Sequence, residues 1–280
     1  FELIIEDASG VNMNDNYDIS YITGTLEIVP RQLTVKTATS TKIYDGESLS
    51  NPNYDIVNGA LVSGHAMSVA QYPSITDAGQ TENILEFEFV NDKGETVTDN
   101  YEVMLESGTL EVTPRPIALR PLDEEKMYDG TPLTANEVIL TGEYALVNGH
   151  ELNANISGSQ TNVGTSPSTV VEDSVTILDG EGNDVLENYA ITYEEGTLEV
   201  TPRPITLRPV DEEKMYDGTP LTANEVILTG EYALVNGNEL NADISGSQTN
   251  VGTSPSSVIS ASVTILDGEG TKVLNNYAIS

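Results

Sequence analysis

The sequence predicts an all-β protein built as a tandem array of small antiparallel β-sandwich domains of the immunoglobulin-like type. An Asn-Tyr pair recurs at spacings of 84, 88 and 88 residues, which is the length of a small domain rather than of a solenoid turn. Turn signals about every 8 to 12 residues separate short alternating runs, and no stretch has an apolar stripe with the helical period. A β-grasp-like roll uses the same strand patterns and stays open as the alternative fold.

A strand that ends in proline marks the boundaries of the repeats. The pattern Gly-Thr-Leu-Glu-(Val/Ile)-(Thr/Val)-Pro-Arg occurs at 24–31, 108–115 and 196–203. Proline cannot donate to a β-ladder, and another alternating run follows at once, so almost no linker separates the repeats. Because Pro-Arg-Pro restricts the backbone at Arg115 and Arg203, we expect extended, semi-rigid junctions.

This frame divides the chain into four parts. Residues 1–30 are the C-terminal part of a preceding repeat, 31–114 and 115–202 are complete repeats, and 203–280 is a repeat that lacks its last strand. The chain begins at Phe1 without a signal peptide, so we expect an excised or processed window on a longer protein. The alternative is a last repeat whose open edge is completed by a strand of another chain.

The elements of one repeat follow a regular order, which the third repeat illustrates. A short strand at 205–208 precedes a polar loop at 211–221, where Asp-Gly and Thr-Pro are strong turn signals. Further strands are predicted at 225–228, 239–246, 258–266 and 277–279, with a hairpin turn at 267–270. The only helix candidate, 144–152 and its copy at 232–240, contains Val-Asn-Gly, which favours a turn.

Composition excludes several classes of function. The formal net charge of −34 argues against nucleic acid and against anionic membrane surfaces, and we interpret it as a solvated surface that keeps an array soluble. With no cysteine, the chain has no thiolate chemistry and no disulfides, so its cores depend on Val, Ile, Leu and Tyr. No apolar run approaches the about 18 residues that span a bilayer, so no membrane insertion is expected in this segment.

A Lys-x-Tyr-Asp-Gly motif occurs once in each repeat. We predict that its tyrosine is buried and anchors the loop over one end of the sandwich, with its hydroxyl bonded to backbone; a ligand-stacking tyrosine is the alternative. The tyrosines of the Asn-Tyr pairs are predicted to pin the closing hairpin in a similar way. These structural residues are Tyr44, Asp45, Gly46, Tyr128, Asp129, Gly130, Tyr216, Asp217, Gly218, Tyr17, Tyr101, Tyr189 and Tyr277.

The motif lysine stands out because lysine is scarce in this chain. We expect a lysine whose stem packs on the surface and whose ammonium pairs with Asp or Glu. The alternative is a Lys-Asn isopeptide crosslink, as in surface domains of some Gram-positive bacteria, and intact mass distinguishes the two because each bond releases one ammonia. The residues of that alternative are Lys42, Lys126, Lys214, Asn100, Asn188 and Asn276.

Recurrence argues against catalytic and metal-binding residues. His65 and His150 occupy equivalent positions, but the third repeat has Asn238 there, so a polar turn residue explains all three. The acidic segment 179–184 resembles a calcium loop, yet its third-repeat copy carries Thr271 and Lys272, so a hairpin turn is favoured over calcium. Carboxylate pairs are too numerous to identify a glycosidase site. We therefore predict no enzyme, no catalytic residue and no cofactor.

The combined motifs resemble a known group of repeats. The order Tyr-Asp-Gly-Thr-Pro-Leu, Val-Gly-Thr, Asn-Tyr and Gly-Thr-Leu-Glu-Val is similar to the MBG/YDG-type tandem repeats of bacterial cell-surface, adhesin-like proteins. The resemblance covers essentially the whole chain, although the first repeat has Asp77-Ala78-Gly79 in place of Val-Gly-Thr. It implies an extracellular, surface-attached multidomain stalk on a bacterial cell, and it brings no catalytic residues.

The sequence therefore predicts a structural stalk or spacer that projects a distal domain, with neighbouring repeats as its partners. Near identity supports this, because 115–149 and 203–237 differ at only two positions. The alternative is a multivalent adhesin that binds host glycan or protein, for which Tyr54 and Tyr72 of the first repeat are the best contact residues. A second copy of the chain, through the open edge of 203–280, is a further candidate partner.

Overall fold

The computed structural model describes residues 3–280, and this part of the chain is all-β, as predicted. Its regular structure consists of 25 short strands and six 3-10 turns of three residues each. Residues 144–150 contain a turn at Asn148 and Gly149, shortly before β12 (Glu151–Asn153), so the turn was the right interpretation of this segment. None of the helical turns described has the length and apolarity of a membrane-spanning helix.

The chain forms two compact units that do not follow the predicted repeat boundaries. The first consists of Phe1–Ser40, Ser50–Ser74 and Thr81–Leu110, and the second of Thr41–Leu49, Ile75–Gln80 and Glu111–Ser280. We call residues 31–114, 115–202 and 203–280 repeats 1, 2 and 3. The two short segments of repeat 1 that belong to the second unit, 41–49 and 75–80, are called the tip of repeat 1.

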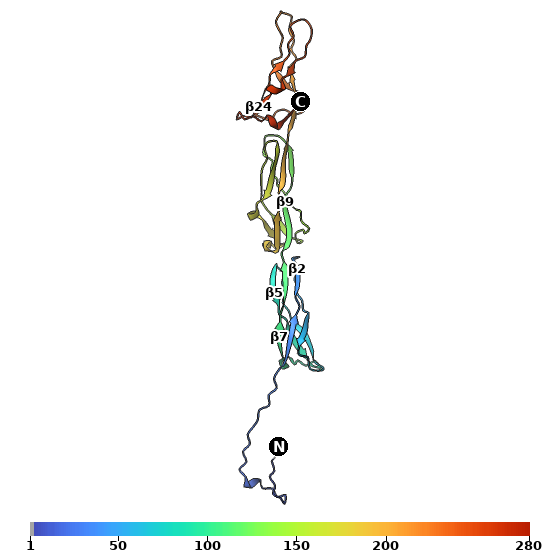
Figure 1. The fold of residues 1–280 in the computed structure, drawn as a ribbon, viewed down its shortest axis with the longest axis vertical. Coiled ribbons are helices and arrows are strands. Elements are labelled where there is room, and N and C mark those ends of the chain that lie inside the picture. Colours follow the sequence, from blue (N-terminus) through green and yellow to red (C-terminus); the bar gives the residue numbers. More distant parts are fainter. Residues whose placement is uncertain (1–2) are drawn as a thin grey trace. The chain divides into compact units, whose positions relative to one another are not determined.

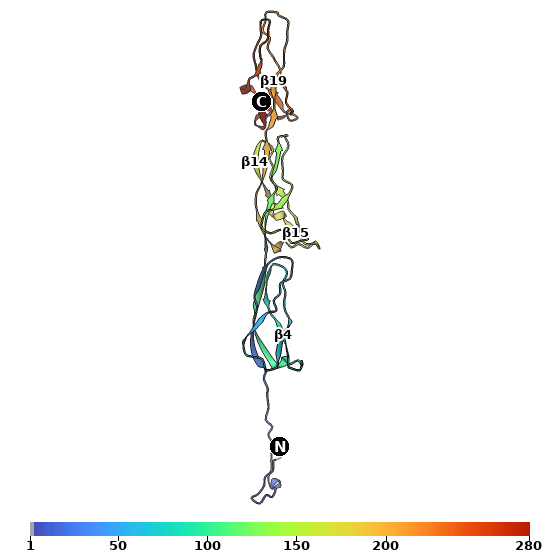
Figure 2. The same ribbon diagram turned by 90° about the vertical axis from the view of Figure 1, so that its right-hand side faces the viewer.

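The first unit holds the core of repeat 1. β1 (Arg31–Thr37) lies between β3 (Tyr54–Asn58) and β7 (Tyr101–Glu106), while β4 (Ala66–Gln71) pairs with β6 (Glu86–Val90). Figure 1 labels β7 and Figure 2 labels β4. Alternation along β1 buries Leu33 and Val35, which pack with Phe89 and Tyr101 in one cluster. The strands β2 (Ser40–Ile43), β5 (Gly79–Asn83) and β8 (Gly108–Thr113) are divided between the units.

Repeat 2 is the complete repeat of the second unit. One sheet has the order β11-β9-β16, from β11 (Val138–Leu140), β9 (Arg115–Pro121) and β16 (Tyr189–Tyr193). Another has the order β10-β17-β14-β13, from β10 (Glu124–Met127), β17 (Gly196–Thr201), β14 (Gly164–Val170) and β13 (Ile156–Ser157). β12 pairs with β15 (Thr176–Leu178), which Figure 2 labels together with β14. The core joins β9 to β14 and β15 through Ile117, Leu119, Val170 and Ile177.

Repeat 3 has the same order of elements, but its strands are only two or three residues long. Its pairs are β18 (Arg203–Ile205) with β25 (Tyr277–Ile279), β19 (Leu207–Pro209) with β20 (Val226–Leu228), β21 (Glu239–Asn241) with β24 (Thr264–Leu266), and β22 (Ile244–Ser245) with β23 (Ser257–Val258). The predicted strand at 239–246 is therefore two strands, and the one at 258–266 is interrupted by a 3-10 turn at Ser260–Ser262. In residues 203–280 no strand corresponds to β10 or β17.

The sheets are mixed, which corrects the prediction of a purely antiparallel sandwich. The first strand of each repeat pairs in parallel with the Asn-Tyr strand: β1 with β7, β9 with β16, and β18 with β25. β10 and β17 are also parallel. A parallel pair requires a long crossover, and here almost an entire repeat connects its two members. Local alternation predicts strands but carries no information on which distant strands become neighbours.

The predicted strand before repeat 1 has no partner in the structure. A 3-10 turn at Asn14–Asn16 precedes an extended segment that runs to Pro30 without strand pairing, dark blue in Figure 1. Its apolar side chains Leu26 and Ile28 are 101% and 97% exposed. The alternation of this segment is that of β17, but nothing in residues 3–280 covers it.

Candidate functional site at the repeat junctions

The motif tyrosine is buried in the core of the repeat that follows its own. Tyr44 belongs to the tip of repeat 1, yet it is 3% exposed and packs with Ile117, Leu119 and Ile177 of repeat 2. Tyr128 of repeat 2 is 4% exposed in the core of repeat 3, with Ile205 and Ile265. We predicted that each tyrosine would anchor the loop of its own repeat. That prediction is wrong in location, because the tyrosine extends beyond the end of its own sheets into the next core.

Tyr216, the third motif tyrosine, lies outside any core. It is 62% exposed, and the flanking Met215 is 91% exposed. Its sequence neighbourhood is identical to that of Tyr128, from the lysine through the proline. Burial of this side chain therefore depends on a following repeat and not on the loop that carries it.

The tyrosine of the next Asn-Tyr pair receives the motif tyrosine edge-on. The rings of Tyr44 and Tyr189 have centroids 5.8 Å apart at 77°, and those of Tyr128 and Tyr277 are 5.6 Å apart at 79°. Edge-to-face contact is a favoured aromatic geometry and adds about 0.5–1.5 kcal/mol beyond burial. Burial raises the pKa of Tyr44 and of Tyr189, so both phenols remain neutral across the physiological pH range.

The asparagine of each pair holds the preceding tip by two hydrogen bonds. Asn188 is 5% exposed; its Nδ2 donates to Asp77 Oδ1 at 2.9 Å, and its Oδ1 accepts from Ala78 N at 2.6 Å. Asn276 repeats the arrangement, donating to Asn162 Oδ1 at 2.9 Å and accepting from Val163 N at 2.8 Å. We call this pair of bonds the asparagine clasp. It uses both the donor and the acceptor of one buried amide, as burial requires.

The boundary arginine, which the Pro-Arg-Pro pattern had marked only as a restricted backbone position, fixes the same junction through its side chain. Arg115 donates from Nε to Ala145 O at 2.7 Å and from Nη1 to Tyr44 O at 3.2 Å, and its guanidinium lies 4.9 Å from the Tyr144 ring centroid. Arg203 makes the equivalent contacts with Ala233, Tyr128 and Tyr232. The signal was present in the sequence, because an arginine follows each boundary proline. The sequence alone did not indicate which residues this arginine contacts, because the motif loop lies beside it only in the folded chain.

The motif glycine allows the loop to approach the next repeat closely. Gly46 and Gly130 have φ of 82° and 80°, a region that L side chains rarely adopt. A Cβ at Gly46 would lie 2.9 Å from Val147 Cγ1, and one at Gly130 would lie 2.8 Å from Val235 Cγ1. Gly218 has φ of 75° with nothing nearby. The glycine is thus needed for the turn in all three repeats, and for docking in two.

The motif lysine binds its own loop rather than an asparagine. Lys126 Nζ donates to Asp129 Oδ1 at 2.7 Å and to Thr131 O at 2.6 Å; Lys42 pairs likewise with Asp45, and Lys214 with Asp217. Asn188 and Asn276 are engaged in the clasps, and Asn100 is exposed. Within residues 3–280 no lysine ammonium is hydrogen-bonded to these asparagines. The lysine thus forms the carboxylate pair that we expected. The lysine nitrogens do not lie at the asparagine side chains, as an isopeptide bond would require.

The lysine pair predicts a measurable shift in a carboxyl pKa. The Lys126 hydrogen bond, with that of the Thr131 amide, lowers the pKa of Asp129 to about 2. Because the folded pKa lies below the unfolded one, the stabilisation is present above about pH 4 and lost as pH falls toward 2; for an exposed pair it is below about 1 kcal/mol. NMR titration of Asp129 should show its pKa rising in Lys126→Met. An unchanged pKa would contradict this pairing.

The histidine position supports the tyrosine of the Asn-Tyr pair in its own repeat. Tyr189 OH accepts from Val147 N at 3.1 Å and lies 2.7 Å from His150 Nδ1. Tyr101 has the same partners in Val62 N and His65 Nδ1, and Tyr277 has Val235 N and Asn238 Nδ2. These hydroxyls are thus bonded to the turn that reads Val-Asn-Gly in repeats 2 and 3 and Val-Ser-Gly in repeat 1. Our prediction that they pin the closing hairpin is wrong. Histidine and asparagine are interchangeable here because either supplies one polar atom.

Replacing His150 with asparagine should therefore be nearly neutral. Repeat 3 already carries Asn238 at this position, with Nδ2 at 2.7 Å from the tyrosine hydroxyl. We expect His150→Asn to change the free energy of unfolding by less than about 0.5 kcal/mol, whereas His150→Leu leaves a part-buried hydroxyl without its side-chain partner and costs about 1 kcal/mol. Chemical denaturation of the two variants tests this. Equal destabilisation by both would contradict the assigned role.

The acidic hairpin engages its own oxygens. Asp179 Oδ1 accepts from Glu181 N at 2.9 Å and Asn183 N at 2.8 Å, and Asp179 Oδ2 accepts from Asn183 Nδ2 at 2.9 Å. The Asn183 amide is the main cause of a lowered pKa at Asp179. Asp267 makes the same backbone contacts in repeat 3. Among the described residues, no group of three or more His, Cys, Asp or Glu side chains is arranged to hold a metal ion.

The remaining predicted site residues lie where no preceding tip is docked. Asn100 is exposed although Tyr101 beside it is 7% exposed, and Tyr17, before the extended segment, is 58% exposed. Tyr101 instead stacks on Phe89 with centroids 4.4 Å apart. The clasp and the motif tyrosine thus come together at two places, both in the second unit.

Comparison with known proteins adds little to this geometry. No family model matches the chain, and no curated protein does. A search of solved structures finds one described as "Structures of Clostridium thermocellum CbhA fibronectin(III)-like modules", which is 11% identical over 62% of this chain and 90% of that chain, with a TM-score of 0.19. A TM-score this low carries no argument about fold or function. The all-β class of this chain therefore rests on its own strands, and its candidate site on its own repeated junction.

Proposed function

We propose that this chain is a spacer: a string of β-domains whose docked junctions project a distal domain from a bacterial cell surface. One observation supports it above all, namely that three kinds of recurring residue converge on the two contacts between repeats described above. The motif tyrosine, the clasp asparagine and the boundary arginine all serve to join one repeat to the next. The extracellular bacterial location rests on the resemblance to MBG/YDG-type repeats.

The junction favours stiffness over flexible tethering. Each following core is incomplete without a side chain from the preceding tip, so bending at the junction would expose a tyrosine and break the buried clasp. Exposing a large aromatic costs about 2–3 kcal/mol, and leaving a buried amide unpaired costs about 1–3 kcal/mol. A spacer of this kind holds a distal domain at a defined distance, and this distance increases with the number of repeats.

Distance measurements across one junction test the spacer. Because the chain has no cysteine, spin labels can be placed at Glu151→Cys and Glu239→Cys, which are equivalent exposed positions of β12 and β21. We expect a single narrow distance distribution that broadens when Tyr128 and Asn276 are both changed to alanine. A broad distribution in the unaltered junction would overturn the proposal.

The adhesin alternative has one remaining aromatic candidate. Tyr54 packs edge-on against Phe87 with centroids 4.9 Å apart and donates its hydroxyl to Met67 O, so it serves the core of repeat 1. Tyr72 is 54% exposed. Glycan-array or mucin binding that is specific and lost in Tyr72→Ala would favour an adhesin over a spacer.

A further inference from the structure

The first and last segments of repeat 2 lie side by side and run in the same direction. β9 pairs in parallel with β16 over five positions, and β10 pairs in parallel with β17 over four. The partner lies 74 positions later in both ladders, from Arg115 with Tyr189 to Met127 with Thr201. We call these two segments, from Arg115 to Met127 and from Tyr189 to Thr201, the terminal strand pair. Because both ladders have the same register, the two segments stay neighbours as they pass from one sheet to the other.

Side-chain hydrogen bonds bridge the interruption between the two ladders. Arg120 Nε donates to Glu195 O at 3.0 Å, and Thr197 N donates to Asp123 Oδ1 at 2.7 Å. Arg120 and Asp123 also bond each other, from Nη2 to Oδ1 at 2.6 Å. The bonding between the two segments therefore continues where the backbone ladder stops.

Tension along the chain acts on opposite ends of the terminal strand pair. β8 ends at Thr113 and β9 begins at Arg115, so a single proline connects the preceding repeat to this pair. At the other end, β17 ends at Thr201 and β18 begins at Arg203. Because the two segments are parallel, a pull on the chain draws Arg115 and Thr201 apart along the strand direction. Such a pull loads all of the cross-strand bonds at once, whereas a pull across one end breaks them one after another.

β17 is also held by its other neighbours. It lies between β10 and β14, and it forms five antiparallel residue pairs with β14. Its inward side chains Leu198 and Val200 are 0% and 1% exposed. Sliding of β17 along β10 would therefore break a second ladder and displace two core side chains, and both changes raise the barrier to unfolding.

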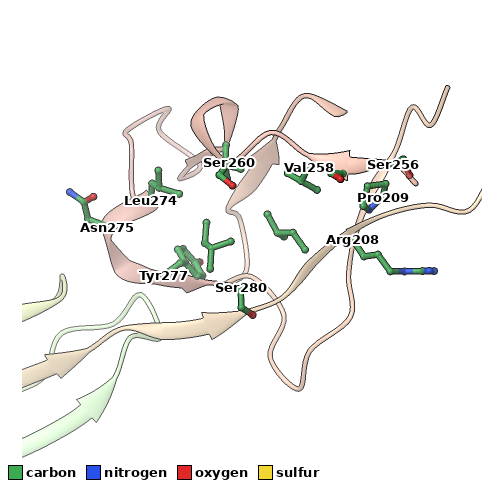
Figure 3. A pocket seen from close by; sticks show the side chains of 13 residues that line it. Arg208, Pro209, Ser256, Val258, Ser260, Leu274, Asn275, Tyr277 and Ser280 are labelled. Carbon is green, nitrogen blue, oxygen red and sulfur yellow. The ribbon is translucent and has the colours of Figure 1, made fainter. Parts of the chain in front are cut away.

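The parallel pairing of an early with a late strand recurs in the other repeats. β1 pairs with β7 over six positions in repeat 1, and β18 pairs with β25 over three in repeat 3. In repeat 1 a side chain again extends the contact, because Thr109 N donates to Thr39 Oγ1 at 3.2 Å. In repeat 3 Ser280 N donates to Ile205 O at 3.0 Å; Figure 3 labels Tyr277 of β25 and Ser280, which follows it.

We infer that the repeat bears force, and that its terminal strand pair resists tension applied through the neighbouring repeats. This function goes beyond the spacer, because a spacer can hold a distal domain at a distance without resisting a pull. Forced unfolding is governed by the barrier to unfolding and not by the equilibrium stability, so a small repeat with short sheets can resist force when its bonds are loaded in shear. The inference rests on the proposed function only for the source of the tension.

Single-molecule pulling of the full chain in two directions tests the inference. Because the sequence has no cysteine, handles can be attached at introduced cysteines. Pro116→Cys with Glu199→Cys loads the terminal strand pair along the strands. Pro116→Cys with Ala190→Cys loads it across one end, because these two residues face each other. All three positions are exposed. We expect the rupture force along the strands to be at least about twofold higher than the force across them.

Two controls separate the direction of the load from a loss of stability. Both double variants should unfold at the same urea concentration, because the replaced side chains are exposed. Asp123→Ala removes the bridge and should lower the rupture force along the strands, with little effect on the force across one end. Asp173→Ala, which changes an exposed aspartate outside the terminal strand pair, should lower neither.

Equal rupture forces in the two directions would overturn the inference. So would a loss of force along the strands that is as large for Asp173→Ala as for Asp123→Ala. The spacer is tested separately, because a broad distance distribution across the junction would refute it while leaving the comparison of forces within repeat 2 unchanged.

Discussion

Replacing Tyr44 with alanine is expected to destabilise repeat 2 by about 3 kcal/mol or more, although the residue belongs to repeat 1. The ring is 3% exposed within the core cluster of repeat 2 and contacts Tyr189 edge-on. Truncation removes its apolar burial and leaves a cavity that the surrounding β-strands can close only partly. Hydrogen exchange resolved by peptide should show lost protection across 115–202, with β1 and β4 of the first unit unchanged.

Tyr216→Ala is the matched control for this result. The same substitution in the same motif removes a side chain that is 62% exposed, so the free energy of unfolding should change by less than about 0.5 kcal/mol. Equal losses at Tyr44 and Tyr216 would show that the tyrosine supports its own loop, and the docked junction would then be refuted.

Changing Asn188 to aspartate should destabilise the first clasp by about 3 kcal/mol at pH 7. The amide that donates to Asp77 Oδ1 becomes a second carboxylate, held almost fully buried within hydrogen-bonding distance of the first. Burial and the neighbouring charge raise the pKa of the new group above its unfolded value. Its ionised form therefore opposes folding at neutral pH, and the loss shrinks below about pH 5 as the pair shares one proton.

The second clasp provides the control for the first. Asn276 faces Asn162 rather than an aspartate, and an amide can turn its Nδ2 toward a carboxylate. Asn276→Asp should therefore cost at least about 1 kcal/mol less than Asn188→Asp, and Asp77→Asn should recover that difference in the double variant. Urea unfolding of the unaltered chain, the two single variants Asn188→Asp and Asn276→Asp, and the double variant Asp77→Asn/Asn188→Asp, at pH 7 and pH 4.5, measures both free-energy differences. A loss at Asn188→Asp that does not depend on Asp77 would rule out the clasp.

The extent to which the sequence specifies this protein differs between local and long-range features. Alternating residues, boundary prolines and Asp-Gly turns act within a few positions, so the strands at 225–228 and 277–279 and the turn at 267–270 could be predicted to within about two residues. The single strand predicted at 205–208 is wrong, because the chain there forms β18 and β19, which pair with different strands. Recurrence also selected the motif tyrosines, two of which are buried at the junctions. It could not say which repeat each tyrosine would enter, because motif and repeat share one period.

By itself, the sequence determined the all-β class, the repeat length and the set of residues that recur. Only the tertiary structure decided that Tyr44 and Tyr128 complete the following core, that Asn188 and Asn276 clasp the preceding tip, and that the first strand pairs in parallel with a late one. The physical reason is that alternation and turn chemistry act over a few bonds. Pairing of a clasp amide, in contrast, requires partners that the chain brings together from 110 to 114 positions away.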